Sequence, residues 1–158
     1  MYDINKCHPI DLDDLVRLGR NCDGGYILSK RQIDSTKILL SFGLSDDWSF
    51  EKDFAKINNV KTYSYDHSIK DRAFVNKKFT KIFLKMMYNL FLLKRARVKR
   101  YFNEFSLSKD FYLFFDNKEH FFIPKFIGQY DDDKNICFQT IFEEIGNVEE
   151  HSVFIKWI

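Results

Sequence analysis

Proline and glycine are scarce in this chain of 158 residues, which contains Pro 2 and Gly 6. Hydrophobic residues make up 45% of the sequence and aromatic residues 18%, which can supply a dense core and excludes a disordered chain. Domains of roughly 100–200 residues are typical, so the length leaves little room for a second one. We therefore expect residues 1–158 to form a single domain.

Cysteines and long apolar runs are also scarce. The three cysteines, Cys7, Cys22 and Cys137, are widely spaced and form no CxxC pair, so neither a disulfide framework nor a zinc site is indicated. The longest uncharged apolar run, Met86–Leu93, is far shorter than the roughly 20 residues that cross a bilayer. The first residues are too polar for a signal peptide. We expect a soluble, cytoplasmic protein.

Residues with GC-rich codons are few. Phe, Tyr, Met, Ile, Asn and Lys account for 72 residues, whereas Gly, Ala, Arg and Pro account for 18. The first group has AT-rich codons, which favours an AT-rich, bacterial genome. Part of the Phe and Lys enrichment therefore reflects mutation bias.

Net charge is small for the whole chain but large in its parts. The formal net charge is +2, yet residues 70–100 contain eleven basic residues and one acid, Asp71. That segment carries +10, so the remaining residues carry −8. The sequence therefore combines an acidic body with a basic insert.

Strand and helix signals alternate in the acidic body. A short apolar run at 37–44, bounded by polar residues, is typical of a strand buried on both faces. Apolar residues at i, i+4 and i+7 predict a helix over 49–57, with Asp47 or Ser49 as its N-cap. Further predicted elements are strands at 26–28, 60–65 and 152–158, an edge or irregular strand at 121–127 that contains Pro124, and a helix at 136–145. Strands separated by helices predict the α/β class with a parallel sheet.

The basic segment is predicted to be a helical insert at about 70–110. Its apolar residues step by three or four positions from Val75 to Phe105. One interpretation is that this stripe packs on the domain while lysines face solvent. Another is that an amphipathic helix over 75–105 makes a peripheral contact with an anionic membrane, or attracts an anionic substrate. No recognition motif indicates nucleic acid, so we expect no nucleic-acid partner.

A strand, a loop, a helix and a second strand connect Gly43 to Asp66 over 23 residues. This is the geometry of nucleoside binding, in which a glycine permits close approach and a carboxylate accepts hydrogen bonds from adjacent ribose hydroxyls. Only one of the three glycines of a pyrophosphate-binding loop is present, and Asp46 and Asp47 would repel a pyrophosphate. S-adenosylmethionine, which has no phosphate and carries a positive sulfonium, suits this loop better.

Short motifs occur before this unit, within it and near the end of the sequence. The motifs are Arg17-Leu18-Gly19, Asp23-Gly24-Gly25-Tyr26, residues 38–43, Asp46-Asp47 with Ser49-Phe50-Glu51, Tyr65-Asp66-His67, and Val153-Phe154-Ile155-Lys156. In this order they resemble the N-terminal portion of the FkbM-type methyltransferases, which depend on S-adenosylmethionine. The resemblance covers most of residues 15–69 and 136–156.

The resemblance implies an incomplete Rossmann-like class I methyltransferase sheet, with the first four strands in the order 3-2-1-4 and a basic helical insert. It implies a methyltransferase that O-methylates a carbohydrate or other small molecule, with no catalytic residue assigned. Gly43 would lie against the methionine portion of the cofactor and Asp66 would bind its ribose. Ser45 stands where many relatives have a second glycine. The implied cofactor-binding residues are Phe42, Gly43, Ser45, Asp46, Asp66 and His67.

Two alternatives remain beside this interpretation. The family continues after the fourth strand with a stretch of the type Lys-Met-Asp-Ile-Glu-Gly, whereas this sequence ends at 156–158, so we expect a truncated form whose activity is in doubt, or a non-catalytic remnant with a binding role. A nucleotide-sugar glycosyltransferase would instead use Asp131 and Asp133 to hold a metal. The more ordinary interpretation of that acidic run is a solvated helix start whose charges favour the helix dipole.

Overall fold

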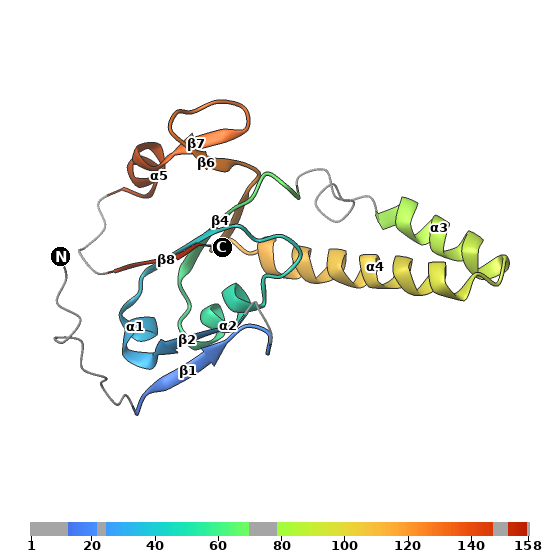
Figure 1. The fold of residues 1–158 in the computed structure, drawn as a ribbon, viewed down its shortest axis with the longest axis horizontal. Coiled ribbons are helices and arrows are strands. Elements are labelled where there is room, and N and C mark those ends of the chain that lie inside the picture. Colours follow the sequence, from blue (N-terminus) through green and yellow to red (C-terminus); the bar gives the residue numbers. More distant parts are fainter. Residues whose placement is uncertain (1–12, 22–24, 70–78, 147–151, 158) are drawn as a thin grey trace, which may run out of the picture.

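A parallel sheet of four strands forms the centre of the body (Figure 1). The computed structural model describes residues 13–21, 25–69, 79–146 and 152–157; the predictions made for Cys7, Cys22, Asp23-Gly24 and Val75 lie outside these residues. The strands are β3 (Ile38–Phe42), β4 (Lys61–Tyr65), β5 (His120–Ile123) and β8 (Val153–Trp157), in the order β5-β4-β3-β8. All neighbouring pairs are parallel. The predicted α/β class with a parallel sheet is confirmed.

Strand β3 is buried on both faces, as its uninterrupted apolar run predicted. Successive side chains of a strand point to opposite faces. Leu39 packs in one cluster with Phe54 of α2 (Ser49–Ile57), and Leu40 packs in another with Ile141 of α5 (Phe138–Ile145). Two layers therefore cover the sheet.

The remaining elements complete these two layers (Figure 1). An antiparallel hairpin of β1 (Leu15–Leu18) and β2 (Tyr26–Ser29) lies on the α2 side, where α1 (Lys30–Ser35) also adds to the core. On the opposite side, α5 is accompanied by the short parallel pair β6 (Phe126–Gly128) and β7 (Asn135–Cys137). The carboxyl ends of β3, β4 and β8 are thereby left at one edge of the body, between the layers.

Three predicted boundaries differ from the structure. The predicted strand at 121–127 is divided at Pro124 into β5 and β6, because proline cannot donate to a strand ladder. The predicted helix at 136–145 begins at Phe138, after β7. The N-cap of α2 is Trp48, neither Asp47 nor Ser49, although an Asp47 side-chain oxygen accepts a hydrogen bond from the Ser49 amide at 3.0 Å.

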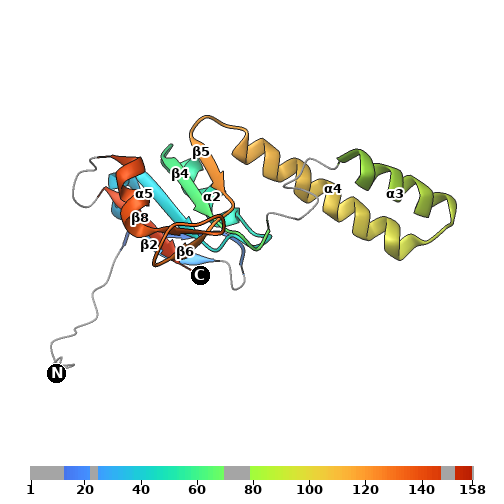
Figure 2. The same cartoon turned by 90° about the horizontal axis from the view of Figure 1, so that it is seen from above.

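The basic insert consists of two helices, α3 (Phe79–Phe91) and α4 (Arg95–Phe115), which form a hairpin projecting from the body (Figures 1 and 2). The last turns of α4 anchor the hairpin, since Phe111 and Phe114 are buried in a cluster with Trp48. The prediction of a helical insert is confirmed, but the interpretation that its apolar stripe packs on the domain is wrong for α3. That helix packs along α4, and most of its apolar side chains remain exposed. In the described part of the chain, no helix is long and apolar enough to span a membrane.

Candidate functional site

The carboxyl ends of β3, β4 and β8 border a cavity of about 370 Å³, which we term the sheet-edge cavity. In open α/β sheets, ligands bind outside the carboxyl ends of the strands, at the point where the strand order reverses. Strand β3 occupies that point, because the chain continues from it to β4 and β5 on one side and returns to β8 on the other. The lining residues are Phe42, Gly43, Tyr65, Asp66, Ser68, Phe126, Ile127 and Trp157.

Gly43 ends β3 with a left-handed backbone, at φ 80°. Its amide donates a hydrogen bond to the Tyr65 carbonyl at 3.0 Å, which ties the start of the β3–α2 loop to the end of β4. A glycine adopts this conformation without the steric cost that a Cβ would add. The glycine predicted from the sequence therefore has a backbone reason to be there and lines the cavity as expected.

Asp66 follows β4 and holds the loop after β3 from the other side. One carboxylate oxygen accepts hydrogen bonds from the amides of Leu44 and Ser45 at 2.8 and 2.7 Å. The other accepts from the Ser68 amide at 2.7 Å and from the Ser68 hydroxyl at 2.6 Å. A carboxylate offers about four acceptor positions, so all of them are engaged within the protein.

These contacts determine the charge of Asp66. Burial by itself raises the pKa of the carboxyl group, but the hydrogen bonds from the Ser68 hydroxyl and from the amides of Ser45, Leu44 and Ser68 outweigh it. The pKa of Asp66 therefore lies below its ordinary value of 3.8, and the group is a carboxylate at neutral pH. Of its four donors only the Ser68 hydroxyl can rotate away, so a ligand hydroxyl would reach Asp66 by replacing that one donor.

Aromatic side chains form much of the remaining wall. Trp157 is 59% exposed; its ring lies 5.3 Å from that of Phe42, edge to face, and is stacked at 5.9 Å on that of Phe138. Trp157 and Phe42 are register partners on neighbouring strands. Trp157 was not predicted to belong to the site. Aligning the apolar runs at 37–44 and 152–158 as parallel strands would have placed Phe42 and Trp157 side by side.

Tyr65 is also among the residues that line the cavity. Its hydroxyl is buried and has no hydrogen-bond partner among the described residues. Burial, reinforced by the nearby Glu144 and Tyr63, raises the pKa of this hydroxyl well above its ordinary value, so it remains a neutral donor. A buried hydroxyl without a partner is unusual, because such a group loses the hydrogen bonds it makes in water.

Three other residues predicted for the site do not line the sheet-edge cavity. Ser45 is exposed, with a φ of 51°, and contributes only its amide to Asp66. Asp46 lines a different cavity. The His67 ring lies 5.1 Å from that of Phe126, and its Nδ1 atom is 3.0 Å from the Pro124 carbonyl oxygen. The structure thus brings together Phe42, Gly43 and Asp66 from the predicted set.

The cavity that contains Asp46 has a volume of about 310 Å³ and lies between α2 and α4. Its charged side chains largely pair with one another. Asp110 of α4 accepts hydrogen bonds from Lys52 Nζ at 2.6 Å and from Trp48 Nε1 at 2.8 Å, and an Arg20 nitrogen lies 3.4 Å from an Asp47 oxygen. These contacts explain how α4 docks on the body, so we assign the cavity a structural role.

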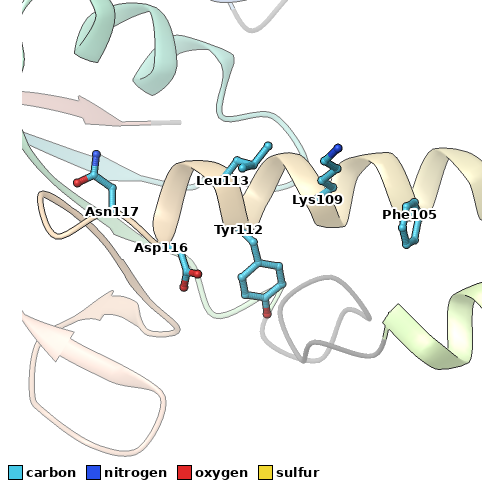
Figure 3. A pocket seen from close by; sticks show the side chains of 6 residues that line it. All are labelled: Phe105, Lys109, Tyr112, Leu113, Asp116 and Asn117. Atoms are coloured by element: carbon cyan, nitrogen blue, oxygen red, sulfur yellow. The ribbon is translucent and has the colours of Figure 1, made fainter.

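A third hollow, of about 450 Å³, runs along α4 and the residues directly after it (Figure 3). Figure 3 shows that its side chains extend from different sides of this one helix rather than toward a common point. It is lined by Phe105, Lys109, Tyr112, Leu113, Asp116 and Asn117. Because the polar groups that line it do not converge, this hollow gives no reason to propose a ligand.

The acidic run Asp131–Asp133 organises the connection between β6 and α5. Asp131 accepts hydrogen bonds from the Thr140 hydroxyl at 2.6 Å and from the Cys137 amide at 2.7 Å, and the hydroxyl bond above all lowers the pKa of Asp131. Asp132 accepts from the amides of the β6–β7 turn. In the residues that the structure describes, no group of three or more His, Cys, Asp or Glu side chains could hold a metal ion. The run is therefore a loop that precedes β7, and the interpretation of it as a helix start is wrong, because α5 begins at Phe138 and has no acidic residue in its first turn.

Comparisons of the chain with protein-family models, with curated proteins and with solved structures found no match. The sheet-edge cavity is therefore the feature of the molecule that indicates a function.

Proposed function

We propose that this chain binds S-adenosylmethionine in the sheet-edge cavity and belongs to a methyltransferase that acts on a hydroxyl of a carbohydrate or other small molecule. The observation that carries the proposal is the joint position of Gly43 and Asp66. They end neighbouring parallel strands, border the same cavity, and lie where the strand order reverses. The order β5-β4-β3-β8 also corresponds to the 3-2-1-4 order implied by the resemblance to the FkbM-type methyltransferases.

The lining suits an adenosine. The exposed ring of Trp157 offers a surface on which a base can stack, an interaction that tolerates any base because each has a π-face. The Asp66 carboxylate, with its exchangeable Ser68 hydroxyl, offers an acceptor for a ribose hydroxyl. These groups match the base and the ribose in kind.

The charge of the lining suits the remainder of the cofactor. Among the described residues that line the cavity, Asp66 is the charged one, and it is negative. A phosphate would meet no basic side chain there, whereas a sulfonium is attracted by the carboxylate. The same reasoning disfavours a nucleotide sugar.

When bound, S-adenosylmethionine would supply an electrophilic methyl group: the acceptor oxygen would bond to the methyl carbon as the carbon–sulfur bond breaks, the sulfur would keep that electron pair as a neutral thioether, and the hydroxyl proton would pass to solvent. The contribution expected from this chain is positional. The hydrogen bonds that the amides of the β3–α2 loop donate to Asp66 keep the cavity wall in place, and Trp157 would fix the plane of the base. Alignment of reactants accounts for a large share of the barrier in such displacements.

Calorimetric titration with S-adenosylmethionine tests the proposal. We expect saturable binding, with UDP-sugar plus manganese giving none. Trp157→Ala should weaken binding by about fivefold or more, because it removes a stacking surface. Phe121→Ala, at an exposed aromatic residue on the edge strand β5, is the matched control and should leave binding unchanged. A folded chain that binds the UDP-sugar instead, or whose affinity is indifferent to Trp157→Ala, contradicts the proposal.

A further inference from the structure

Helix α3 has two apolar faces, and α4 covers only one of them. Ile82 and Asn89 are buried on the side of α3 that packs along α4, about two turns apart. The opposite face exposes a continuous group of large apolar side chains, namely Phe83, Leu84, Met87, Tyr88, Leu90 and Phe91. A contiguous group of exposed apolar side chains of this size marks an interaction site, so this face is expected to have a partner.

The apolar surface continues around the tip of the hairpin. Leu93, which joins α3 to α4, is 83% exposed and has a left-handed backbone at φ 54°. Glycine is the usual residue in that conformation, because a Cβ there costs roughly 1 kcal/mol. Folding therefore gives no reason for a leucine at this position, where its side chain extends into solvent.

Basic residues surround this apolar tip. No acidic residue occurs between positions 79 and 103 of the sequence. The basic residues in the same interval are Lys81, Lys85, Lys94, Arg95, Arg97, Lys99 and Arg100, and all of them are exposed. Figures 1 and 2 show that the turn between α3 and α4 lies at the end of the hairpin farthest from the sheet, so the basic start of α4 lies there as well.

We propose that the tip of the α3–α4 hairpin, together with the outer face of α3, inserts into the interface of an anionic membrane. The apolar side chains would enter the boundary between headgroups and acyl chains, while the first turns of α4 hold lipid phosphates. This membrane contact is separate from the proposed cofactor site and does not depend on cofactor binding. An anionic lipid surface is the partner whose chemistry uses both features at once.

Two other partners use only one of these features. A nucleic acid would bind the basic residues but would leave the exposed face of α3 in water. A second copy of the chain would cover the apolar face but would bring two clusters of seven positive charges together, which is repulsive at low salt. Both remain possible outcomes of the test, and each would be recognised by its own readout.

Flotation with vesicles of phosphatidylcholine, with and without about 30% phosphatidylserine, tests the proposal. We expect the full chain to float with the anionic vesicles only, and less so as salt rises and screens the charges. Phe91→Ser with Leu93→Ser should lower the partition coefficient at least tenfold, because both side chains would no longer be buried in the lipid interface. Leu113→Ser, at an exposed leucine on α4 near the body, is the matched control and should have no effect.

Charge is tested separately. Replacing Arg95, Arg97, Lys99 and Arg100 with Gln should reduce binding by about 600-fold at low salt, given about a fivefold loss for each of the four basic residues. The same number of charges removed from the body, at Lys30, Lys61, Lys118 and Lys134, should change binding little, although the net charge is the same in both variants. Equal losses would mean that total charge, not the hairpin, attracts the vesicle.

Phe91→Trp locates the tip directly. Quenching of the new tryptophan by brominated lipids is expected on anionic vesicles, above the signal of a chain without the substitution. Three results would overturn the proposal: no flotation at any salt, flotation that survives the Phe91→Ser and Leu93→Ser changes, or a dimer in solution that those changes dissolve. Tight binding of a nucleic acid that is indifferent to the same changes would overturn it as well.

Discussion

In α2 of the body, Phe50 and Phe54 are 1% and 0% exposed, whereas in α3 of the hairpin Phe83 and Phe91 are 48% and 85% exposed. The residue type is the same and each pair lies in an α-helix, four residues apart in α2 and eight apart in α3. The phenylalanines of α2 pack against the sheet and against one another. The stability of the fold therefore explains the two phenylalanines of α2. Those of α3 contribute little to folding, so a partner is needed to explain them. The following predictions test this difference.

The largest expected effect is at a lysine buried in the body. Lys156 Nζ donates to Glu51 at 2.7 Å, and the same carboxylate oxygen accepts from the Ser41 hydroxyl, beneath the central strands. Lys156→Met should lower the free energy of unfolding by about 3–5 kcal/mol, because it leaves the buried Glu51 carboxylate without its counter-charge. Urea unfolding followed by circular dichroism measures this change.

The same substitution in the hairpin is the control. Lys99→Met removes one exposed charge and should change the free energy of unfolding by less than about 0.5 kcal/mol. Combining Lys156→Met with Glu51→Leu should recover much of the lost stability, since both buried charges are then gone. If Lys156→Met proves harmless by itself, the buried ion pair is not as the structure describes it.

A second comparison uses two phenylalanines in the hairpin, one at its anchor and one at its tip. Phe111 is buried against Trp48, with ring centres 5.4 Å apart, and Phe122 lies 5.2 Å from it on the sheet side. Phe111→Ala should cost about 3 kcal/mol or more, whereas Phe91→Ala should cost almost nothing. Thermal and urea unfolding compare the two, and similar losses would show that the tip packs on something within the chain.

Asp66 should stabilise the body by an intermediate amount that depends on pH. Asp66→Asn should cost about 1.5–3 kcal/mol at neutral pH, because the loop amides lose a charged acceptor. The folded pKa lies below the unfolded value, so this contribution is fully present above about pH 4 and is lost as the pH falls through the lower folded pKa. The stability difference between the two proteins should therefore shrink below about pH 4; a difference that stays constant to low pH would contradict the assignment.

Asp66 and Ser68 also sharpen the cofactor proposal. Ser68→Ala removes the one exchangeable donor from Asp66 and should keep or strengthen S-adenosylmethionine binding, while Asp66→Ala should weaken it by roughly 1.5–3 kcal/mol. Calorimetry on the folded variants separates these outcomes. Loss of binding in Ser68→Ala would show that the hydroxyl itself contacts the cofactor.

The smallest effect is expected at the turn of the hairpin, and its sign is reversed. Leu93→Gly should raise stability by up to about 1 kcal/mol, because glycine adopts the left-handed backbone without strain. The same change should reduce vesicle binding, because the apolar side chain is lost. A variant that is both more stable and a better vesicle binder would contradict the view that the hairpin tip is built for a partner and not for folding.

Local patterns predicted the strands and helices well where one periodicity dominated. The apolar run at 37–44 contains β3, and the stripe over 49–57 matches α2. Prediction failed where a neighbouring strand decided the outcome: β7 takes residues 136 and 137 out of the expected helix, and Pro124 divides one apolar run between two sheets. In the site, Gly43 and Asp66 were predicted from their spacing, whereas Trp157 was missed because its role depends on the register of β8 beside β3.

The sequence by itself determined the α/β class, the separation of a basic insert from an acidic body, and the adjacency of Gly43 and Asp66 at strand ends. Each of these follows from local periodicity, charge or chain length, which act between residues close in sequence. Tertiary structure alone decided that all four acceptor positions of Asp66 are engaged, that Lys156 meets Glu51 across 105 positions, and that α4 covers one face of α3 and not the other. Those outcomes depend on contacts between segments that are distant in sequence, which no local pattern encodes. They are decided when the elements pack, because each apolar surface and each hydrogen-bonding group can then be used by only some of its potential partners.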